Sequence, residues 1–259
     1  MARQAIPRPP WARRVEAAGD GSAMAGTAAG LTMGEVRAVF ATGPAAPDAE
    51  EATGAPGAAV LVVLGAFDKL DEGERDVPGA PGDGPASVLL IRRAAHLRAN
   101  PGEVAFPGGR IEPGESPLAA ALREAEEEVA LPAGAVDVLG ELPMVLASRR
   151  EVPILPFVAA ARGRPALEAN HDEVDGVLVV PLRDLVAPGR YWQERWDRAD
   201  DPAWVMHFFD LGEDVIWGAT ARMLYELFLR LLSRGSGGRT GGLPGARTRP
   251  ASRSTTRAS

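Results

Sequence analysis

The chain has 259 residues, of which 46% are apolar and 24% are charged, and its net charge is −7 at pH 7. These values are typical of a globular protein with one or two domains and a sizeable core. It contains no cysteine, which excludes disulfides, thiolate zinc sites and a cysteine nucleophile. No apolar run is long enough to span a membrane and no signal peptide is visible, so we expect a cytoplasmic protein without a membrane partner.

Both ends of the chain lack the apolar patterns that mark folded segments. Residues 1–30 hold four arginines and an Ala/Gly-rich stretch, and residues 233–259 hold six arginines, no acid and many Gly and Ser residues. We therefore predict a disordered N-terminal segment, 1–30, and a disordered tail, 233–259. Because no aromatic residues alternate with the arginines of the tail, nucleic acid is not expected as a partner.

Residues 31–232 are predicted to form one domain. Its elements begin with a short helix over 31–40 and strands over 58–64 and 87–93, separated by Gly/Pro-rich loops, and residues 94–116 show turn residues without a helical period. The later elements are two clear helices, 117–131 and 215–232, and strands at about 136–142, 154–160, 175–181 and 204–211. Strands with few helices between them predict a mixed α/β fold.

The helix over 117–131 has a distinct acidic face. Ser116 suits its N-cap. At 100° per residue, Glu124, Glu127 and Glu128 lie together, roughly 140° away from an apolar face. Like charges four residues apart repel each other, and a bound cation would remove that repulsion. Oxygen ligands without His or Cys favour Mg²⁺ or Mn²⁺ over zinc, although a solvated acidic face is the alternative interpretation.

The segment before this helix favours the cation site. Phe106-Pro107-Gly108-Gly109 leads from a strand into a loop, and Glu115 directly precedes the helix cap. The two glycines permit the backbone to pass close to a metal or a phosphate, while an ordinary turn is the alternative.

These residues together resemble the signature of the Nudix hydrolases. Gly109, Glu115 and the run Arg123-Glu124-Ala125-Glu126-Glu127-Glu128-Val129-Ala130-Leu131 have the spacing of that signature. The one departure is Ala130, where the family has Gly, and a left-handed Ala costs roughly 1–2 kcal/mol. The resemblance implies an α/β Nudix fold with a mixed β-sheet sandwiched between helices. It also implies hydrolysis of a nucleoside diphosphate linked to another moiety, with Mg²⁺ or Mn²⁺ as cofactor.

The resemblance further implies roles for individual side chains. Glu124, Glu127 and Glu128 are expected to be metal ligands, with Glu127 acting either as a ligand or as the base that takes a proton from the attacking water. Arg123 is expected to orient the carboxylates through a salt bridge. The expected catalytic residues are therefore Arg123, Glu127 and Glu128. The histidines show no metal-ligand spacing and are expected to have structural or solvent roles: His96, His171 and His207.

An upstream segment resembles a second pattern, which marks the coenzyme A pyrophosphatases within the Nudix family. It comprises Leu89-Leu90-Ile91-Arg92-Arg93-Ala94, then Arg98, Gly102 and Phe106-Pro107-Gly108-Gly109, with Ile91 in place of the usual Thr. The run Ile216-Trp217-Gly218-Ala219-Thr220-Ala221 also resembles that subfamily. The resemblance implies cleavage of coenzyme A or its thioesters into 3′,5′-ADP and (acyl-)4′-phosphopantetheine.

The charge of this segment suits an anionic substrate. Residues 89–110 hold four arginines against one glutamate, and Arg suits bidentate contacts with phosphate. Because neighbours on a strand point to opposite faces, at most one of Arg92 and Arg93 should reach the site. The residues selected as substrate-binding are Arg93, Arg98, Gly108, Gly109 and Glu115.

Two other functions stay open. The same chemistry could act on ADP-ribose, a dinucleotide or a nucleoside triphosphate, or the chain could be a non-catalytic Nudix-fold binding or regulatory module. All four glutamates of the signature are intact, which favours a hydrolase with a small-molecule nucleotide substrate. The oligomeric state is also open, with a homodimer as one option.

Overall fold

The apolar run Ala58–Gly65 forms β2, the central strand of the main sheet. Residues 61–64 of this strand are fully buried, which requires cover on both faces of the sheet. β2 pairs in parallel with β8 (Pro153–Ala161) on one side and antiparallel with β3 (Ser87–Arg93) on the other. The computed structural model describes residues 6, 13–15, 20–42, 55–67, 84–146, 152–196 and 205–233.

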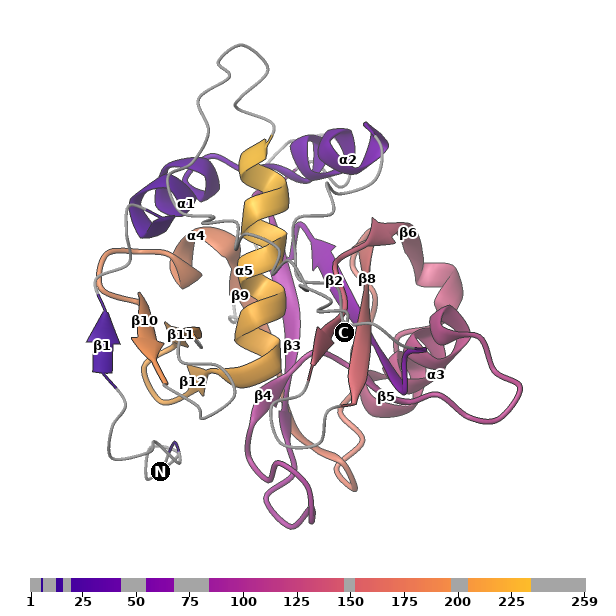
Figure 1. Ribbon diagram of the computed structural model, residues 1–259. Helices are drawn as coiled ribbons and strands as arrows, with labels where there is room; N and C mark the ends of the chain where they lie inside the picture. Colours follow the sequence, from indigo (N-terminus) through magenta and orange to yellow (C-terminus); the bar gives the residue numbers. More distant parts are fainter. Residues whose placement is uncertain are drawn as a thin grey trace, which may run out of the picture.

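Five further strands complete this eight-stranded sheet. β3 also pairs antiparallel with β9 (Val174–Pro181) and β4 (Val104–Ala105), and β5 (Gly108–Arg110) pairs antiparallel with β2. β8 pairs antiparallel with β6 (Val136–Glu141) and β7 (Val145–Leu146). Parallel and antiparallel pairings therefore occur together, and the predicted mixed sheet is confirmed (Figure 1).

Alternate side chains of the central strands pack into two separate cores. On one face, Leu61 and Leu89 pack with the buried alanines of α3 (Pro117–Val129). On the other face, Val62 and Leu90 pack with three helices: α1 (Asp20–Ala28), α2 (Met33–Ala41) and α5 (Gly218–Leu232). Because successive strand residues point to opposite faces, two cores of this kind need helices on both sides. Figure 1 shows α5 crossing one face, and the predicted sandwich is confirmed.

A smaller second sheet lies beside α5. Its strands run in the order β1 (Arg13–Val15), β10 (Tyr191–Arg195), β11 (Val205–Asp210) and β12 (Val215–Ile216). The rings of Trp192 and Phe208 stack on this sheet, with their centroids 5.1 Å apart. Two short elements connect the larger ones: the 3₁₀ turn η1 (Ala133–Ala135) and α4 (Leu182–Leu185).

The folded part of the chain begins earlier than the sequence predicts. Residues 20–28 form α1, whose Met24 and Ala28 are buried in the core beside α5. The prediction of disorder is therefore wrong for this helix. Its apolar side chains pack into the core that α5 also lines. Most of the rest of residues 1–19, and the tail from residue 234 onward, lie outside the described residues.

Three other differences concern short strands. The helix predicted over 215–232 begins at Gly218, because residues 215–216 pair with β11 as β12. The turn-rich stretch 94–116 contains β4 and β5, which are too short to show a strand pattern. Strand β10 was not predicted, because polar side chains interrupt its apolar alternation.

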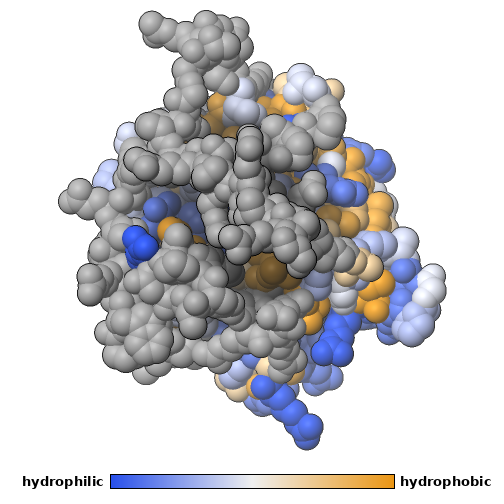
Figure 2. Space-filling view, viewed as in Figure 1, coloured by the Kyte–Doolittle hydropathy of each residue, from blue (hydrophilic) through white to orange (hydrophobic). Residues whose placement is uncertain are grey.

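The surface is mixed in polarity. No helix of the described residues is both long and apolar enough to cross a membrane. Figure 2 shows hydrophilic and hydrophobic residues interspersed where this face is not covered by grey atoms. Within the described part of the chain, the large apolar side chains that are exposed lie on different strands: Val138, Leu146 and Val205. Single exposed residues of this kind are normal in folded proteins.

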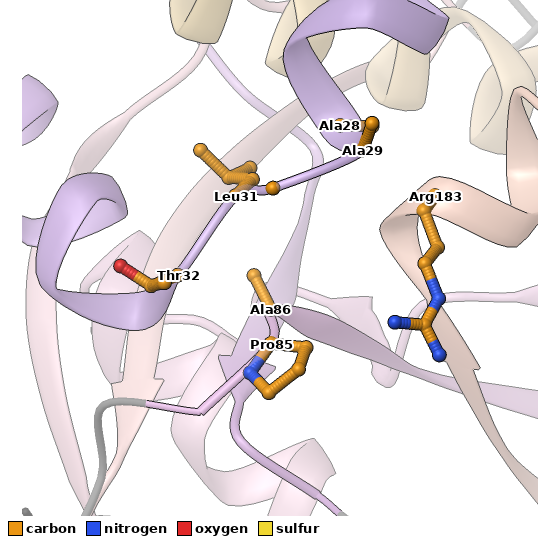
Figure 3. Close-up of a pocket in the computed structure, with 8 residues that line it drawn as sticks. Ala28, Ala29, Leu31, Thr32, Pro85, Ala86 and Arg183 are labelled. Carbon is orange, nitrogen blue, oxygen red and sulfur yellow. The ribbon is translucent and has the colours of Figure 1, made fainter. Parts of the chain in front are cut away.

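A small pocket opens where the turn between α1 and α2 meets the start of β3 (Figure 3). Residues such as Ala28 and Pro85 line it, and Arg183 of α4 contributes the only charged side chain among its lining residues. None of the predicted site residues lines this pocket, so it is separate from the predicted chemistry.

Helix α3 ends at Ala130 in the left-handed conformation. Its φ is 54° and its ψ is 32°, and its N–H donates to the carbonyl oxygens of Ala125 and Glu126. The chain thus keeps the helix end that the family builds with Gly, although an L side chain is strained there. The residue is exposed, so a glycine would leave no cavity.

We expect Ala130→Gly to raise the free energy of unfolding by about 1 kcal/mol, because glycine adopts a positive φ without strain. Urea unfolding followed by tryptophan fluorescence measures this. Ala119→Gly, at an exposed position of the same helix with ordinary helical geometry, is the matched control and should lower stability by about 0.5–1 kcal/mol. A loss of stability in both variants would contradict strain at Ala130.

Candidate functional site

Helix α3 is seated so that its acidic face meets the end of β5. The Ser116 hydroxyl accepts a hydrogen bond from the N–H of Ala119 at 3.2 Å, and Pro117 occupies the first turn, so the predicted cap is confirmed. Small buried side chains, including Ala121 and Ala125, let the helix lie close to β2. This close approach carries the side chain of Glu128 beneath the protein surface.

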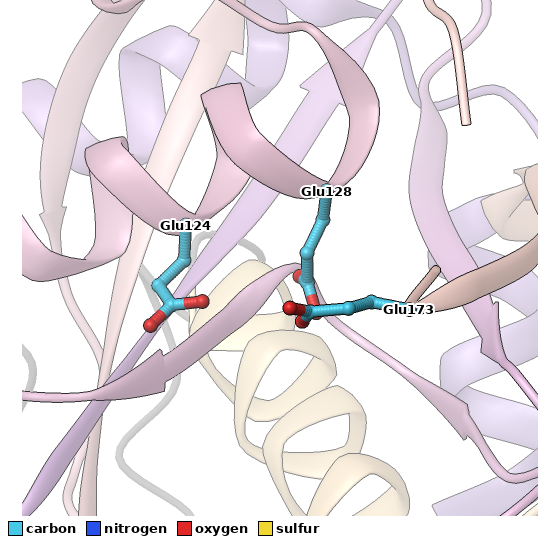
Figure 4. A group of neighbouring side chains, drawn as sticks. All are labelled: Glu124, Glu128 and Glu173. Atoms are coloured by element: carbon cyan, nitrogen blue, oxygen red, sulfur yellow. The ribbon is translucent and has the colours of Figure 1, made fainter. Parts of the chain in front are cut away.

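Three carboxylates converge at this point. Oxygens of Glu124, Glu128 and Glu173 all lie within 4.8 Å of one another, the one such group among the described residues (Figure 4). Glu124 and Glu128 come from α3, and Glu173 comes from the turn directly before β9. Glu173 was not among the predicted site residues. Its proximity depends on β9 pairing with β3, which no local pattern in the sequence reveals.

Glu128 is the buried member of the group, with 1% of its surface exposed. Its Oε2 accepts a hydrogen bond from the N–H of Gly108 at 2.9 Å, and its Oε1 lies 3.7 Å from Nη1 of Arg93. Burial raises the pKa of Glu128 to about 7, and the negative charges of Glu124 and Glu173 add to this effect. The Gly108 hydrogen bond and the charge of Arg93 oppose it.

The two predicted glycines are required by this packing. A Cβ on Gly109 would lie 2.3 Å from Oε1 of Glu124, and a Cβ on Gly108 would lie 2.4 Å from the carbonyl oxygen of Ala59. Gly108 also has a φ of 152°, which L side chains rarely adopt. The glycines therefore make room for the Glu124 carboxylate and let β5 pass against β2. Partial burial raises the pKa of Glu124 as well.

Arg123 links two acidic side chains of α3 to Glu115, which precedes the helix. Its Nε and Nη2 donate to the two carboxylate oxygens of Glu115 at 3.0 and 3.2 Å, and its Nη1 lies 2.9 Å from Glu127 and 3.1 Å from Glu124. It also donates to the carbonyl oxygen of Arg110. This is the geometry of the orienting salt bridge that the resemblance implies for Arg123.

Two of the predicted acidic site residues lie outside the carboxylate group. Glu127 is 56% exposed and faces Arg123. Glu115, predicted to bind substrate, instead has both oxygens engaged, one by Arg123 and the other by Arg123 together with the N–H of Glu112. These bonds hold the pKa of Glu115 below its ordinary value. In this structure its contacts are those of a side chain that holds Arg123 in place.

The neighbouring arginines of β3 point in opposite directions, as the strand geometry predicts. Arg93 reaches toward Glu128, whereas Arg92 forms a two-point ion pair with Asp214, near β12. Asp214 holds the pKa of Arg92 above its ordinary value. Arg98 is exposed on the loop between β3 and β4, which leaves its side chain accessible to a ligand.

The donor set fits a hard divalent cation. Three carboxylates supply only oxygen ligands, and burial raises the pKa of Glu124 and of Glu128 because their protein partners offset only part of its cost. A cation would remove this repulsion, and carboxylates without His or Cys select Mg²⁺-like ions.

Known proteins are similar to this chain. A family model described as "NUDIX domain" matches residues 79–201. A Salmonella paratyphi B protein named "Uncharacterized Nudix hydrolase NudL" is 39% identical over 150 residues, which cover 56% of this chain and 74% of that protein. A solved MutT/nudix family protein from Enterococcus faecalis has 17% identity and a TM-score of 0.43, covering 85% of this chain and 75% of the other. The NUDIX domain of Shewanella oneidensis NrtR, solved with ADP ribose, has 20% identity and a TM-score of 0.36, covering 57% and 85%.

We expect Glu128 to make stability fall as the pH rises. Its pKa is about 7 in the folded chain against an ordinary value of 4.5, so between these values the folded state binds the proton more tightly than the unfolded state. Without metal, the unaltered chain should therefore lose about 3 kcal/mol of unfolding free energy relative to Glu128→Gln between pH 4.5 and a pH above 7. Thermal and urea unfolding across pH 4–8 measures this.

With a saturating divalent cation, the unaltered chain should become the more stable of the two proteins above pH 7, because the Glu128 carboxylate binds the cation and the Gln amide does not. Glu126→Gln, on the exposed side of the same helix, serves as the control and should not alter the pH dependence. Parallel stability profiles for Glu128→Gln and the unaltered chain would show that burial does not shift the Glu128 carboxyl.

Proposed function

The chain belongs to the Nudix hydrolase family, and on that premise we propose that it is a diphosphatase of coenzyme A and its thioesters. The products are 3′,5′-ADP and 4′-phosphopantetheine, or the acyl form of the latter. Nudix hydrolases act on nucleoside diphosphate derivatives and generally use divalent metal ions. The cofactor proposed here is Mg²⁺ or Mn²⁺, held by Glu124 and Glu128 with Glu173 as a third carboxylate.

The observation that carries the diphosphatase proposal is the position of Arg93, while coenzyme A as the substrate rests on the resemblance of the segment that contains this arginine. This arginine belongs to the segment that resembles the coenzyme A pyrophosphatases, and it lies 3.7 Å from Glu128. Its Nε is buried and has no hydrogen-bond partner among the described residues. A cation beside three carboxylates is where a pyrophosphate would bind, and a guanidinium with spare donors suits its second phosphate. Arg98 follows on the adjacent exposed loop and supplies a further positive charge.

Different side chains bind the cation and the substrate phosphates. When bound, Mg²⁺ or Mn²⁺ neutralises the pyrophosphate charge and acidifies the attacking water. Glu128, held by the Gly108 N–H, and Glu124, held by Arg123, keep their oxygens directed at one point. Arg93, whose Nη1 lies 3.7 Å from Glu128, would stabilise the negative charge that develops on the leaving phosphate.

Two carboxylates are candidates for the base that takes the proton from water. Glu127 is the candidate implied by the family resemblance, and its carboxylate is held by Arg123. Glu173 is exposed and lies in the same group as Glu124 and Glu128. A base must lie within reach of the water that it deprotonates, so the base is the residue whose Gln variant loses kcat at saturating metal.

Alternative substrates keep the same chemistry. ADP-ribose, a dinucleotide or a nucleoside triphosphate also carries a pyrophosphate that a cation held by the carboxylate group would bind. A binding module without catalysis is the remaining alternative. The intact carboxylate group favours the hydrolase. A cytoplasmic location and a homodimeric state stay predictions.

We expect the purified chain with Mg²⁺ or Mn²⁺ to convert coenzyme A into 3′,5′-ADP and 4′-phosphopantetheine, detected by mass spectrometry. Glu128→Gln should lower the rate by at least about a hundredfold, because it removes a charged ligand of the cation. Turnover of ADP-ribose, NADH or ATP but not coenzyme A would refute the substrate and retain the hydrolase. Nucleotide binding without turnover of any substrate would favour the binding module.

Kinetics with coenzyme A and with 3′-dephospho-coenzyme A should distinguish the roles of Arg93 and Arg98. Because Arg98 lies on an exposed loop beyond the carboxylates, we expect it to contact the 3′-phosphate. Arg98→Ala should then raise KM for coenzyme A about tenfold, the loss of one charged hydrogen bond, and leave the dephosphorylated substrate unchanged. Arg93→Ala should lower kcat for both substrates.

The matched control for these variants is Arg183→Ala, an exposed arginine at the pocket of Figure 3, which should change neither parameter. An equal rise in KM for both substrates in Arg98→Ala would exclude the contact with the 3′-phosphate.

A further inference from the structure

The turn that carries Glu173 is held from two sides. The end of α3 holds its start, because the N–H groups of Glu168 and Asn170 donate to the carbonyl oxygens of Val129 and Glu128 at 3.1 and 2.9 Å. The start of the loop that follows β3 holds its other end. There the N–H of Ala94 donates to the carbonyl oxygen of Glu173 at 2.8 Å.

The same loop adds a side-chain contact, from His96. Its Nε2 lies 3.1 Å from the carbonyl oxygen of Asp172, the residue directly before Glu173. A carbonyl oxygen only accepts hydrogen bonds, so the ring donates through an Nε2–H. Both the neutral Nε2–H form and the charged form of the ring can make this bond.

Glu173 differs from its two partners in how it is held. Glu128 is buried and Glu124 is half-buried, so packing fixes their carboxylates on α3. Glu173 is exposed, so the position of its carboxylate depends on the backbone of the turn. A bond to the carbonyl of the preceding residue restrains the peptide plane from which the Glu173 side chain departs.

We propose that His96 is a positioning residue of the cation site, which holds the Glu173 turn and links it to the loop that carries Arg98. Arg98 lies two residues after His96, so the predicted phosphate contact and the third carboxylate belong to one hydrogen-bonded unit. This inference rests on the metal-site part of the proposed function and is independent of which substrate is hydrolysed.

Mn²⁺ binding to the full chain tests the proposal without any substrate. Free Mn²⁺ is measured by electron paramagnetic resonance in titrations of the unaltered chain and of three variants. His96→Ala should weaken Mn²⁺ binding about three- to tenfold, the range that one net hydrogen bond implies. His96→Gln retains an N–H donor at similar reach and should bind within about twofold of the unaltered chain. His171→Ala, an exposed histidine on the same turn, is the matched control and should bind normally.

A double-variant cycle shows whether His96 acts through Glu173. Glu173→Gln should weaken Mn²⁺ binding, and adding His96→Ala to it should cause no further loss, because the carboxylate that His96 positions is already gone. An equal loss in both backgrounds would overturn the proposal, since His96 would then act on the structure generally. Two further results would overturn it: unchanged Mn²⁺ affinity in His96→Ala, or Mn²⁺ binding by His96→Gln that is as weak as in His96→Ala.

The titrations separate this inference from the function on which it rests. Mn²⁺ binding that is lost in Glu128→Gln but unaffected by His96→Ala overturns the role of His96 alone. An unaltered chain that binds no Mn²⁺ overturns the metal-dependent function together with this inference. Failure to cleave coenzyme A, with the predicted pattern of Mn²⁺ affinities, leaves the role of His96 supported.

Discussion

The burial of the Glu128 carboxylate is the constraint on which the rest of the site depends. A carboxylate out of reach of water is costly to ionise, and one backbone N–H and a distant guanidinium offset only part of that cost. The site is therefore incomplete until a positive charge arrives. The close packing of α3 that buries Glu128 needs small side chains on the helix and glycines on β5, so the alanines and glycines of this region serve the same requirement.

Arg123 solves a second electrostatic problem, the density of acids on one helix. Glu124 and Glu128 repel each other across one helical turn, and Glu127 adds charge beside them. A single guanidinium fixes two of these side chains, Glu124 and Glu127, and is itself bonded to Glu115 before the helix. The position of Glu115 in the signature is thus explained without a contact to substrate. Glu115 anchors Arg123, which orients the acidic side chains of α3.

The pair of arginines at the end of β3 joins the two sheets to the site. Arg92 is paired with Asp214, beside the second sheet, while Arg93 faces the carboxylates on the α3 side. The strand register shifts between these two residues where β3 meets β9, and the turn with Glu173 ends at that point, where β9 begins. The second sheet therefore contacts the strand that delivers Arg93, which connects the part of the chain after residue 190 to the chemistry on α3.

Local sequence alone determined the main strands, the two long helices, the cap at Ser116 and the clustering of Glu124 with Glu128. These features follow from periodicity and from residue types that act within one turn or one strand. Tertiary structure alone decided that Glu173 joins the carboxylates, that Glu115 holds Arg123 and that α1 belongs to the fold. Each of these depends on segments distant in the chain that meet through strand pairing or helix packing, and such meetings are set by the burial of whole faces rather than by any local pattern.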